Sequence, residues 1–260
     1  MSDYWQQQTN EPLFKEILWS RPENKQQSGK LLIIGGNKFG FAAPAEAYTN
    51  AENSGAGAIR VLLPEALEKI VGHGAFDAYY APTNLSGSFS KQALDSMLVQ
   101  ASWSDYALVA GDLGKNSETA VLLDSFIKKY SGPLCITKDA VDYFIQTPTE
   151  LLKREHTTIV ASYEQLQKIG IHNGNTVPLT FGMPAPAVAE WLHLLTLHIK
   201  SIIVTYHNNQ LFVADNGRVV SQVDKIYTEK IWRVATAAKA SVFVMQNPTQ
   251  PLEAVATSWL

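Results

Sequence analysis

The chain has 260 residues, of which 46% are hydrophobic and 17% are charged, so it is long enough to bury a large α/β core. Twenty-one basic and twenty-four acidic residues give a net charge of −3 without a basic block, which argues against a nucleic-acid or anionic-membrane partner. No apolar run reaches membrane-spanning length, and the first residues do not read as a signal peptide. The lone cysteine, Cys135, excludes an intramolecular disulfide. We therefore expect a cytoplasmic protein.

No linker, charge run or repeat divides the sequence. We therefore expect a single domain over residues 1–260, with residues 1–28 as an N-terminal extension that packs on it. Within that extension, the apolar cluster between Leu13 and Trp19 has the spacing of a short amphipathic helix.

The segment from Gly29 to Pro64 reads as a βαβ unit. The apolar run Leu31–Ile34 predicts a buried strand, and Gly35 and Gly36 end it where a backbone must turn sharply or approach a ligand. A helix over about 44–53 and a second strand over 58–63 follow. The first loop of such a unit lies where open α/β sheets bind ligands.

The rest of the chain alternates strands and helices and closes with three strands joined by turn-forming residues, which predicts a terminal β-meander. This order predicts a three-layer α/β/α sandwich with a mostly parallel central sheet. Further strands are expected at 106–110, 134–137, 157–161, 201–205, 210–214 and 218–223. Helices are expected at about 65–71, 150–154, 164–169 and 252–260. Five more helices are expected to start at Leu94, after a cap at Asn116 or Ser117, at Asp139 (continuing into Phe144), after Pro184 and at about 228.

Four stretches in this order resemble one family. They are Gly35–Gly57, Val109–Gly114, Ile136–Val141 and the helix start at Pro251. The family motif Gly-Pro-Gly-Leu-Gly reads Ala-Gly-Asp-Leu-Gly from Ala110, and Asp-Ala-Asp-Ala-Leu reads Thr-Lys-Asp-Ala-Val up to Val141. From about Arg21 to Leu260 the chain resembles the ADP/ATP-dependent NAD(P)H-hydrate dehydratases, members of the ribokinase-like superfamily.

The resemblance implies a repair reaction. These enzymes remove the hydroxyl of hydrated NADH or NADPH as water, driven by the phosphoryl group of ADP or ATP with Mg²⁺. The chemistry needs a base for the hydroxyl proton and amides that neutralise the transferring phosphate. The family supplies both from a Gly-Thr/Ser-Gly-Asp loop at a helix N-terminus, with the Asp as base.

The sequence departs from the family at that loop, whose place falls on about Trp232–Ala235. Trp232 cannot give the close backbone approach of a glycine, and Val234 and Ala235 cannot act as a base. The Leu-Lys-Gly strand end of the family is Val-Thr-Tyr here, ending at Tyr206. The substrate motif Thr-Pro-His-Pro-Gly-Glu is shortened to four residues around Tyr163, without a histidine.

Asp112 is a fourth departure, because it brings a negative charge in place of a loop glycine. It reads either as a solvated charge or as a receptor for a cationic ligand. Asp139 likewise reads either as a ligand contact or as a plain helix N-cap. Lys38, Lys115 and Lys138 either converge on phosphates or are solvated.

The resemblance implies two sets of ligand contacts and leaves the catalytic residue unknown, with the family Asp position near Ala235. We expect no metal-binding residues. The six histidines have no metal-ligand spacing. The implied substrate contacts are Ala43, Gly111, Asp112, Gly114, Asp139 and Tyr163, and the implied nucleotide contacts are Gly35, Gly36, Asn37, Thr205 and Tyr206.

Three hypotheses follow. The first is an enzyme, either a divergent dehydratase or a small-molecule kinase of the same superfamily. The second is a pseudoenzyme that binds an NAD(P)H hydrate or a nucleotide-like molecule without turnover. The third is a partner subunit. Because the hydrophobic periodicity is intact while ligand-facing positions have changed, we predict a retained scaffold with an altered or inactive site. We also expect a homo-oligomer.

Overall fold

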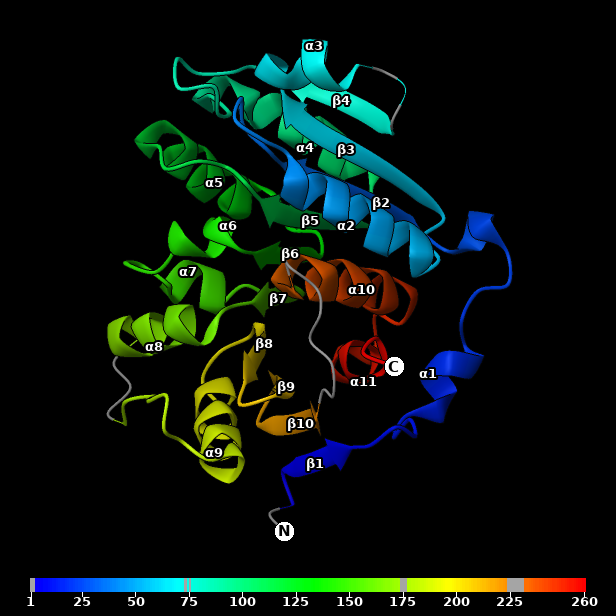
Figure 1. The fold of residues 1–260 in the computed structure, drawn as a ribbon, viewed down its shortest axis with the longest axis vertical. Helices are drawn as coiled ribbons and strands as arrows, with labels where there is room; N and C mark the ends of the chain where they lie inside the picture. The colour runs from blue at the N-terminus through cyan, green and yellow to red at the C-terminus, as the bar shows by residue number, and fades with distance from the viewer. Residues whose placement is uncertain (1–2, 73, 75, 174–176, 224–231) are drawn as a thin grey trace.

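The computed structural model describes residues 3–72, 74, 76–173, 177–223 and 232–260. These residues form a ten-stranded sheet in the order β1-β10-β9-β8-β7-β6-β5-β2-β3-β4, with helices on both faces (Figure 1). The strands are β1 (Trp5–Gln8), β2 (Lys30–Gly35), β3 (Ala58–Pro64), β4 (Asp77–Ala81), β5 (Tyr106–Gly111), β6 (Leu134–Thr137), β7 (Thr157–Val160), β8 (Ile202–His207), β9 (Gln210–Asp215) and β10 (Arg218–Val223).

The sheet is parallel from β4 through β8, and β9 is antiparallel to both of its neighbours, β8 and β10. The strand β1 then pairs in parallel with β10 at the far edge. The predicted mostly parallel sheet with a terminal β-meander is therefore confirmed.

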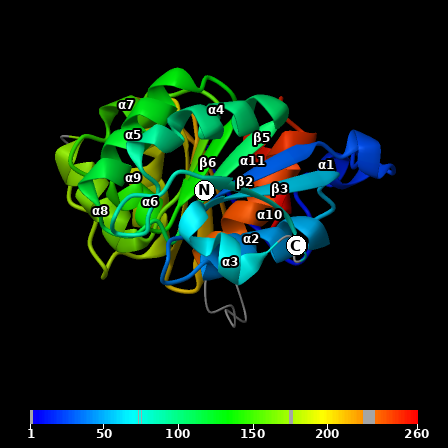
Figure 2. The ribbon, with the colours of Figure 1, turned by 90° about the horizontal axis from the view of Figure 1, so that it is seen from above.

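Two apolar layers cover the sheet, because alternate residues of each strand point to opposite faces. In β2, Leu32 and Ile34 belong to one buried cluster, while Leu31 and Ile33 belong to the other. Figure 2 shows α4 and α2 on opposite sides of β2. The helices that cover the first cluster are α4 (Leu94–Trp103), α5 (Ser117–Lys129), α6 (Asp139–Asp142), α7 (Thr149–Leu152), α8 (Tyr163–His172) and α9 (Ala185–Thr196). The helices that cover the second cluster are α1 (Lys15–Trp19), α2 (Ala42–Asn53), α10 (Trp232–Gln246) and α11 (Pro251–Thr257). The short helix α3 (Glu68–Val71) follows a 3-10 turn at Glu65–Leu67.

Two edge strands were not predicted from the sequence. The strand β1 has three glutamines in four residues and lacks the apolar alternation of a strand. It is fixed by side-chain contacts instead: Trp5 donates to the Ser221 hydroxyl (2.9 Å), and Gln8 donates to the Ala256 carbonyl oxygen (2.8 Å). The strand β4 is likewise half-exposed along most of its length.

Some expectations fall on residues outside the described ranges. These are the start of the last long helix, expected at about 228, and most of the turn that the residues Asn173, Gly174 and Asn175 predict from the sequence. Within the described ranges, no helix is both long and apolar enough to cross a membrane.

Candidate ligand site

Three loops meet at the carboxyl edge of the central strands. They follow β2, β5 and β6, which are neighbours in the sheet. The Gly36 N–H donates to the Gly111 carbonyl oxygen (2.9 Å), and a Cβ on Gly35 would collide with that oxygen and lie 2.9 Å from Cγ of Pro44. Close packing of the two loops therefore requires a glycine at Gly35, and the φ of 90° at Gly36 favours a glycine there, whatever ligand the loops meet.

The backbone of these loops has unusual dihedral angles. Gly111 has a φ of 107°, and the next residue, Asp112, has a φ of 58°. Lys138, at the end of β6, has a φ of 57°. Side chains rarely adopt this left-handed region, so other contacts must hold Asp112 and Lys138 in place.

The Asp112 carboxylate is held from two sides. It accepts a hydrogen bond from the Ala43 N–H (2.7 Å) in the first turn of α2, and it forms a salt bridge with the Lys138 ammonium. Phe41, at the N-cap position of α2, provides no side-chain cap. Asp112 therefore satisfies a helix N-terminus that would otherwise offer free N–H groups to an anion. Its charge is balanced by Lys138 rather than left to solvent.

Asp139 is not the N-cap of α6, so that interpretation of the sequence is wrong. Lys138 occupies the N-cap position, and Asp139 is the first helical residue. The Asp139 side chain turns back to the β5 loop, where Oδ2 accepts from the N–H groups of Leu113 (2.8 Å) and Gly114 (3.2 Å). Its Oδ1 is buried and has no hydrogen-bond partner among the described residues. Burial, the largest effect, raises the pKa of Asp139, and the Leu113 N–H opposes it.

Asn37 joins the β2 and β5 loops. Its amide nitrogen donates to the Asp112 carbonyl oxygen (2.5 Å), and its amide oxygen accepts from the Phe39 N–H (2.8 Å). Tyr143 donates to the Gly114 carbonyl oxygen from the other side. Both polar groups of the Asn37 side chain are thus used within the protein.

A polar network extends from these loops to the start of α10. Gln165 donates to the Lys138 carbonyl oxygen (2.7 Å) and to Asp142 (2.6 Å), and it accepts from Arg233 (2.9 Å). Burial lowers the pKa of Arg233, and Asp142 opposes that shift. Neither Gln165 nor Arg233 was predicted from the sequence as a residue of the site. The motif Ser162-x-x-Gln165, which forms a capping box at α8, was the readable signal for Gln165.

The three expected contacts around β8 do not share one wall. Tyr163 stacks on His207 (centroids 3.9 Å apart) and donates to the Thr180 carbonyl oxygen (2.9 Å), and burial raises its pKa to about 12. Thr205 is fully buried. Tyr206 points to the opposite face, with its ring 5.6 Å from that of Trp232. Only some of these side chains can face one ligand.

A cavity of about 290 Å³ opens beside Asp139. It is lined by Gly114, Asp139, Tyr143 and the start of α5, where Asn116 caps the helix by accepting from the Glu118 N–H (2.8 Å). The predicted Asn116 cap is therefore confirmed. Gly35, Gly36 and Asn37 do not line this cavity.

The three lysines expected near phosphates are separated. Lys138 pairs with Asp112, Lys115 lines the cavity beside Asp139, and the Lys38 ammonium lies 4.9 Å from the centre of the Phe39 ring. Among the described residues, no group of His, Cys, Asp and Glu side chains is arranged to hold a metal ion. Cys135 is buried, and burial raises the pKa of its thiol to about 12, so it is an inert core residue.

No protein-family model matches the chain. Among curated proteins, it is similar to the bifunctional NAD(P)H-hydrate repair enzyme Nnr of Moorella thermoacetica, with 21% identity over 194 residues, 73% of this chain and 36% of that protein. The enzyme of the same name from Methanocaldococcus jannaschii is 31% identical over 126 residues, 45% of this chain and 23% of that protein. The matches thus span about a third and a quarter of those relatives.

Solved structures share the fold across nearly the whole chain. A ribokinase-like superfamily protein from Enterococcus faecalis superimposes with a TM-score of 0.72 at 16% identity, over 99% of this chain and 86% of that one. The ADP/ATP-dependent NAD(P)H-hydrate dehydratase from Bacillus subtilis, co-crystallised with ATP/Mg²⁺, gives 0.63 at 13% identity, over 96% and 86%. An adenosine kinase from Anopheles gambiae gives 0.60 at 9% identity, over 98% and 90%. The predicted ribokinase-like fold is confirmed.

Proposed function

We propose that this protein is a ribokinase-like ligand-binding protein, similar to the NAD(P)H-hydrate repair enzymes, that binds a nucleotide-like molecule at the carboxyl edge of its sheet without ADP/ATP-driven dehydration. One observation carries the proposal. The Asp112 carboxylate accepts from Ala43 and pairs with Lys138, at the position where the family has a loop glycine. A group of the protein itself thus fills a helix N-terminus that could otherwise bind an anion.

The residues at the start of α10 do not fit the family's phosphate loop. The chain has no glycine after Gly217, so a glycine cradle for a phosphate has no counterpart before or within α10. In the first turn of α10, Val234 and Ala235 are buried and carry no base. The two carboxylates that precede α10 most closely in the sequence, Asp224 and Glu229, lie outside the described residues. The described start of α10 therefore supplies neither a glycine cradle nor a base for phosphoryl transfer.

Binding without turnover fits what the site does offer. Asp112 and Lys138 compensate each other, so the edge does not repel a phosphate-bearing ligand as a lone Asp112 would. Lys115, on the wall of the cavity beside Asp139, adds a cationic group within reach of a ligand there.

A second candidate is an active dehydratase with a substitute base. The observation that favours it is Asp139, whose buried Oδ1 has no partner among the described residues and whose pKa is raised. A carboxylate with a raised pKa is better suited to accept a proton near neutral pH.

Ligand-dependent thermal unfolding tests the binding proposal. Saturating ADP or NADPH should raise the Tm of the wild type, because a ligand that binds only the folded state stabilises it. Asp112→Gly frees Lys138 and the start of α2, so it should tighten ADP binding at least about tenfold, or 1.4 kcal/mol. Asp95→Asn, an exposed residue of α4, is the matched control and should leave affinity unchanged. No shift with either ligand would refute the proposal.

A further inference from the structure

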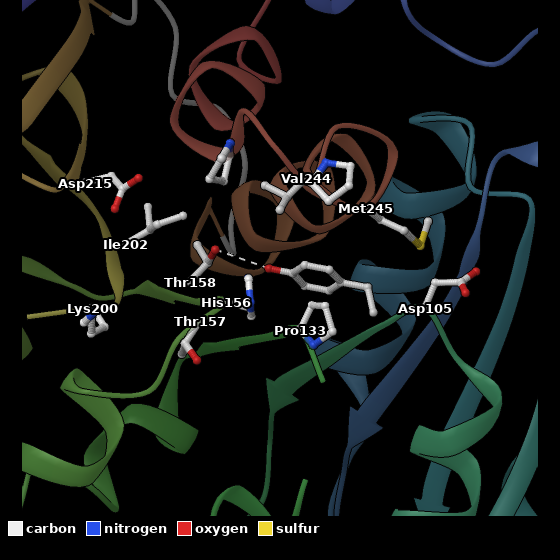
Figure 3. A pocket seen from close by; sticks show the side chains of 13 residues that line it. Asp105, Pro133, His156, Thr157, Thr158, Lys200, Ile202, Asp215, Val244 and Met245 are labelled. Carbon is white, nitrogen blue, oxygen red and sulfur yellow. Dashed lines mark hydrogen bonds between the residues drawn. The ribbon is translucent and has the colours of Figure 1, made fainter. Parts of the chain in front are cut away.

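A larger cavity, of about 430 Å³, lies at the opposite edge of the sheet (Figure 3). Asp105, Pro133 and His156 line it, and each directly precedes a parallel strand: β5, β6 and β7. Asp215 also lines it and ends β9, which runs antiparallel and so reaches the same edge. The cavity therefore lies at the amino ends of the central strands, away from the loops that hold Asp112 and Asp139.

Most of the wall is apolar. Ile202 contributes from β8, and Val244 and Met245 contribute from the last turns of α10. Pro248 lines the cavity from the turn between α10 and α11, and Pro251 lines it from the first position of α11. This wall suits an apolar ligand body, which gains from leaving water.

Among the described residues, the polar side chains of the cavity wall are partnered except for the His156 ring and the Asp215 carboxylate. The Tyr106 hydroxyl donates to the Thr158 hydroxyl (3.2 Å), which is the dashed bond in Figure 3. Asp105 accepts from the Lys30 N–H (2.8 Å), and Lys200 pairs with Glu155 (3.3 Å). The remaining charged group is Asp215.

Among the described residues, no hydrogen bond or salt bridge reaches the Asp215 carboxylate. Its nearest cation in sequence, Arg218, is paired with Glu253 (2.7 Å). Burial, more than repulsion by Glu253, raises the pKa of Asp215, and the charge of Arg218 opposes this shift without a salt bridge to the carboxylate. A poorly hydrated carboxylate without a partner favours an incoming cation.

We propose that this cavity binds a small organic cation, with an ammonium group on Asp215 and an apolar body against Ile202, Val244 and Met245. An anionic ligand would meet the carboxylates of Asp105 and Asp215, because the Lys200 ammonium in the wall is already paired with Glu155. A neutral ligand would bring no charge to pair with Asp215. The site thus prefers an amine over its alcohol or acid analogue. This inference is independent of the function proposed for the carboxyl edge.

Three probes of similar size and different charge test the proposal: phenethylamine, 2-phenylethanol and phenylacetate. In calorimetric or NMR titrations of the wild type, the amine should bind at least about tenfold more tightly than either analogue. Asp215→Asn should abolish that preference, while Asp95→Asn, which changes the net charge equally, should retain it.

The location of binding is a separate readout on the wild type. The amine should shift the amide resonances of Thr158 and Ile202, and leave those of Gly111 and Gly114 in place. Equal binding of the three probes, no binding of the amine, an unchanged preference in Asp215→Asn, or shifts confined to Gly111 and Gly114 would each overturn the proposal.

Discussion

At the carboxyl edge of the sheet, the charge of Asp112 is compensated inside the protein. The sequence marked Asp112 as a departure from a glycine motif, but not the salt bridge with Lys138, which lies 26 residues further along the chain. Nor could it reveal the hydrogen bond from Ala43. Strand order brings β2, β5 and β6 together, and such long-range pairings leave no local signal. Residue types at the site were thus predictable, while their partners were not.

Removing the Asp112 side chain should destabilise the protein to an extent that depends on the replacement. Asp112→Ala loses the Ala43 bond and the Lys138 pair and keeps a side chain at positive φ, so its free energy of unfolding should fall by about 1–2 kcal/mol. Asp112→Gly loses the same contacts, but glycine adopts this φ freely, so about 1 kcal/mol should be recovered. Urea denaturation measures both. Unfolding free energies equal to that of the wild type would mean that the pair contributes nothing.

Asp139 should make stability depend on pH. Because its pKa is raised above 3.8 in the folded state, the native protein binds the proton more tightly than the unfolded chain. This contribution is full below pH 3.8 and is lost as the pH rises through the raised pKa. Asp139→Asn has no carboxyl group to titrate at this position. As the pH rises through that window, the free energy of unfolding of the wild type should therefore fall relative to that of Asp139→Asn. Denaturation at a series of pH values tests this, with Asp95→Asn as a control that should follow the wild type.

A constant stability difference between Asp139→Asn and the wild type at all pH values would contradict that assignment. It would mean that Asp139 titrates alike in the folded and unfolded chains, and it would remove the main support for Asp139 as a substitute base.

At the scale of elements, apolar runs and turn signals were sufficient for the interior of the sheet. The predicted bounds of β6 and β10 match the structure, since each is a short run delimited by turn-forming residues. The edge strand β1 was missed because its pairing depends on Trp5 and Gln8 contacting distant residues. Edge strands bury little apolar surface, so a hydrophobic pattern seldom reveals them.

The contact between the β2 and β5 loops predicts a sharp contrast between two glycines. In Gly35→Ala the new methyl group meets the Gly111 carbonyl oxygen and Pro44, so the free energy of unfolding should fall by about 2–4 kcal/mol. Gly40→Ala has no atom within 4 Å of the new methyl group. Its effect should stay within about 0.5 kcal/mol. Thermal or urea unfolding compares the two, and equal losses would refute the close packing of these loops.

At the scale of the whole molecule, one sheet contains all ten strands of the described residues, from β1 at one edge to β4 at the other. The fold and its layers followed from the alternation of strands and helices, because burial of both faces of a parallel sheet leaves few other arrangements. The ligand did not follow, because it depends on which side chains pair at the two edges. We propose that residues 1–260 form a single domain, and the expected homo-oligomer stays a prediction.

A single domain should unfold in one cooperative step. Circular dichroism and tryptophan fluorescence should give coincident urea transitions, since Trp5 lies in β1 at one edge of the sheet and Trp103 contacts Arg60 of β3 near the other. Two separated transitions would instead show that the region around β8 to β10 unfolds independently of the βαβ half.

The most direct test of the central claim is the repair reaction itself. Purified protein is incubated with hydrated NADPH, ADP or ATP, and Mg²⁺, and the return of reduced-nicotinamide absorbance is followed beside an active homologue in the same buffer. We expect no recovery with this protein, while the homologue restores NADPH. Recovery that requires both this protein and the nucleotide would contradict it, and loss of that recovery in Asp139→Asn would identify the substitute base.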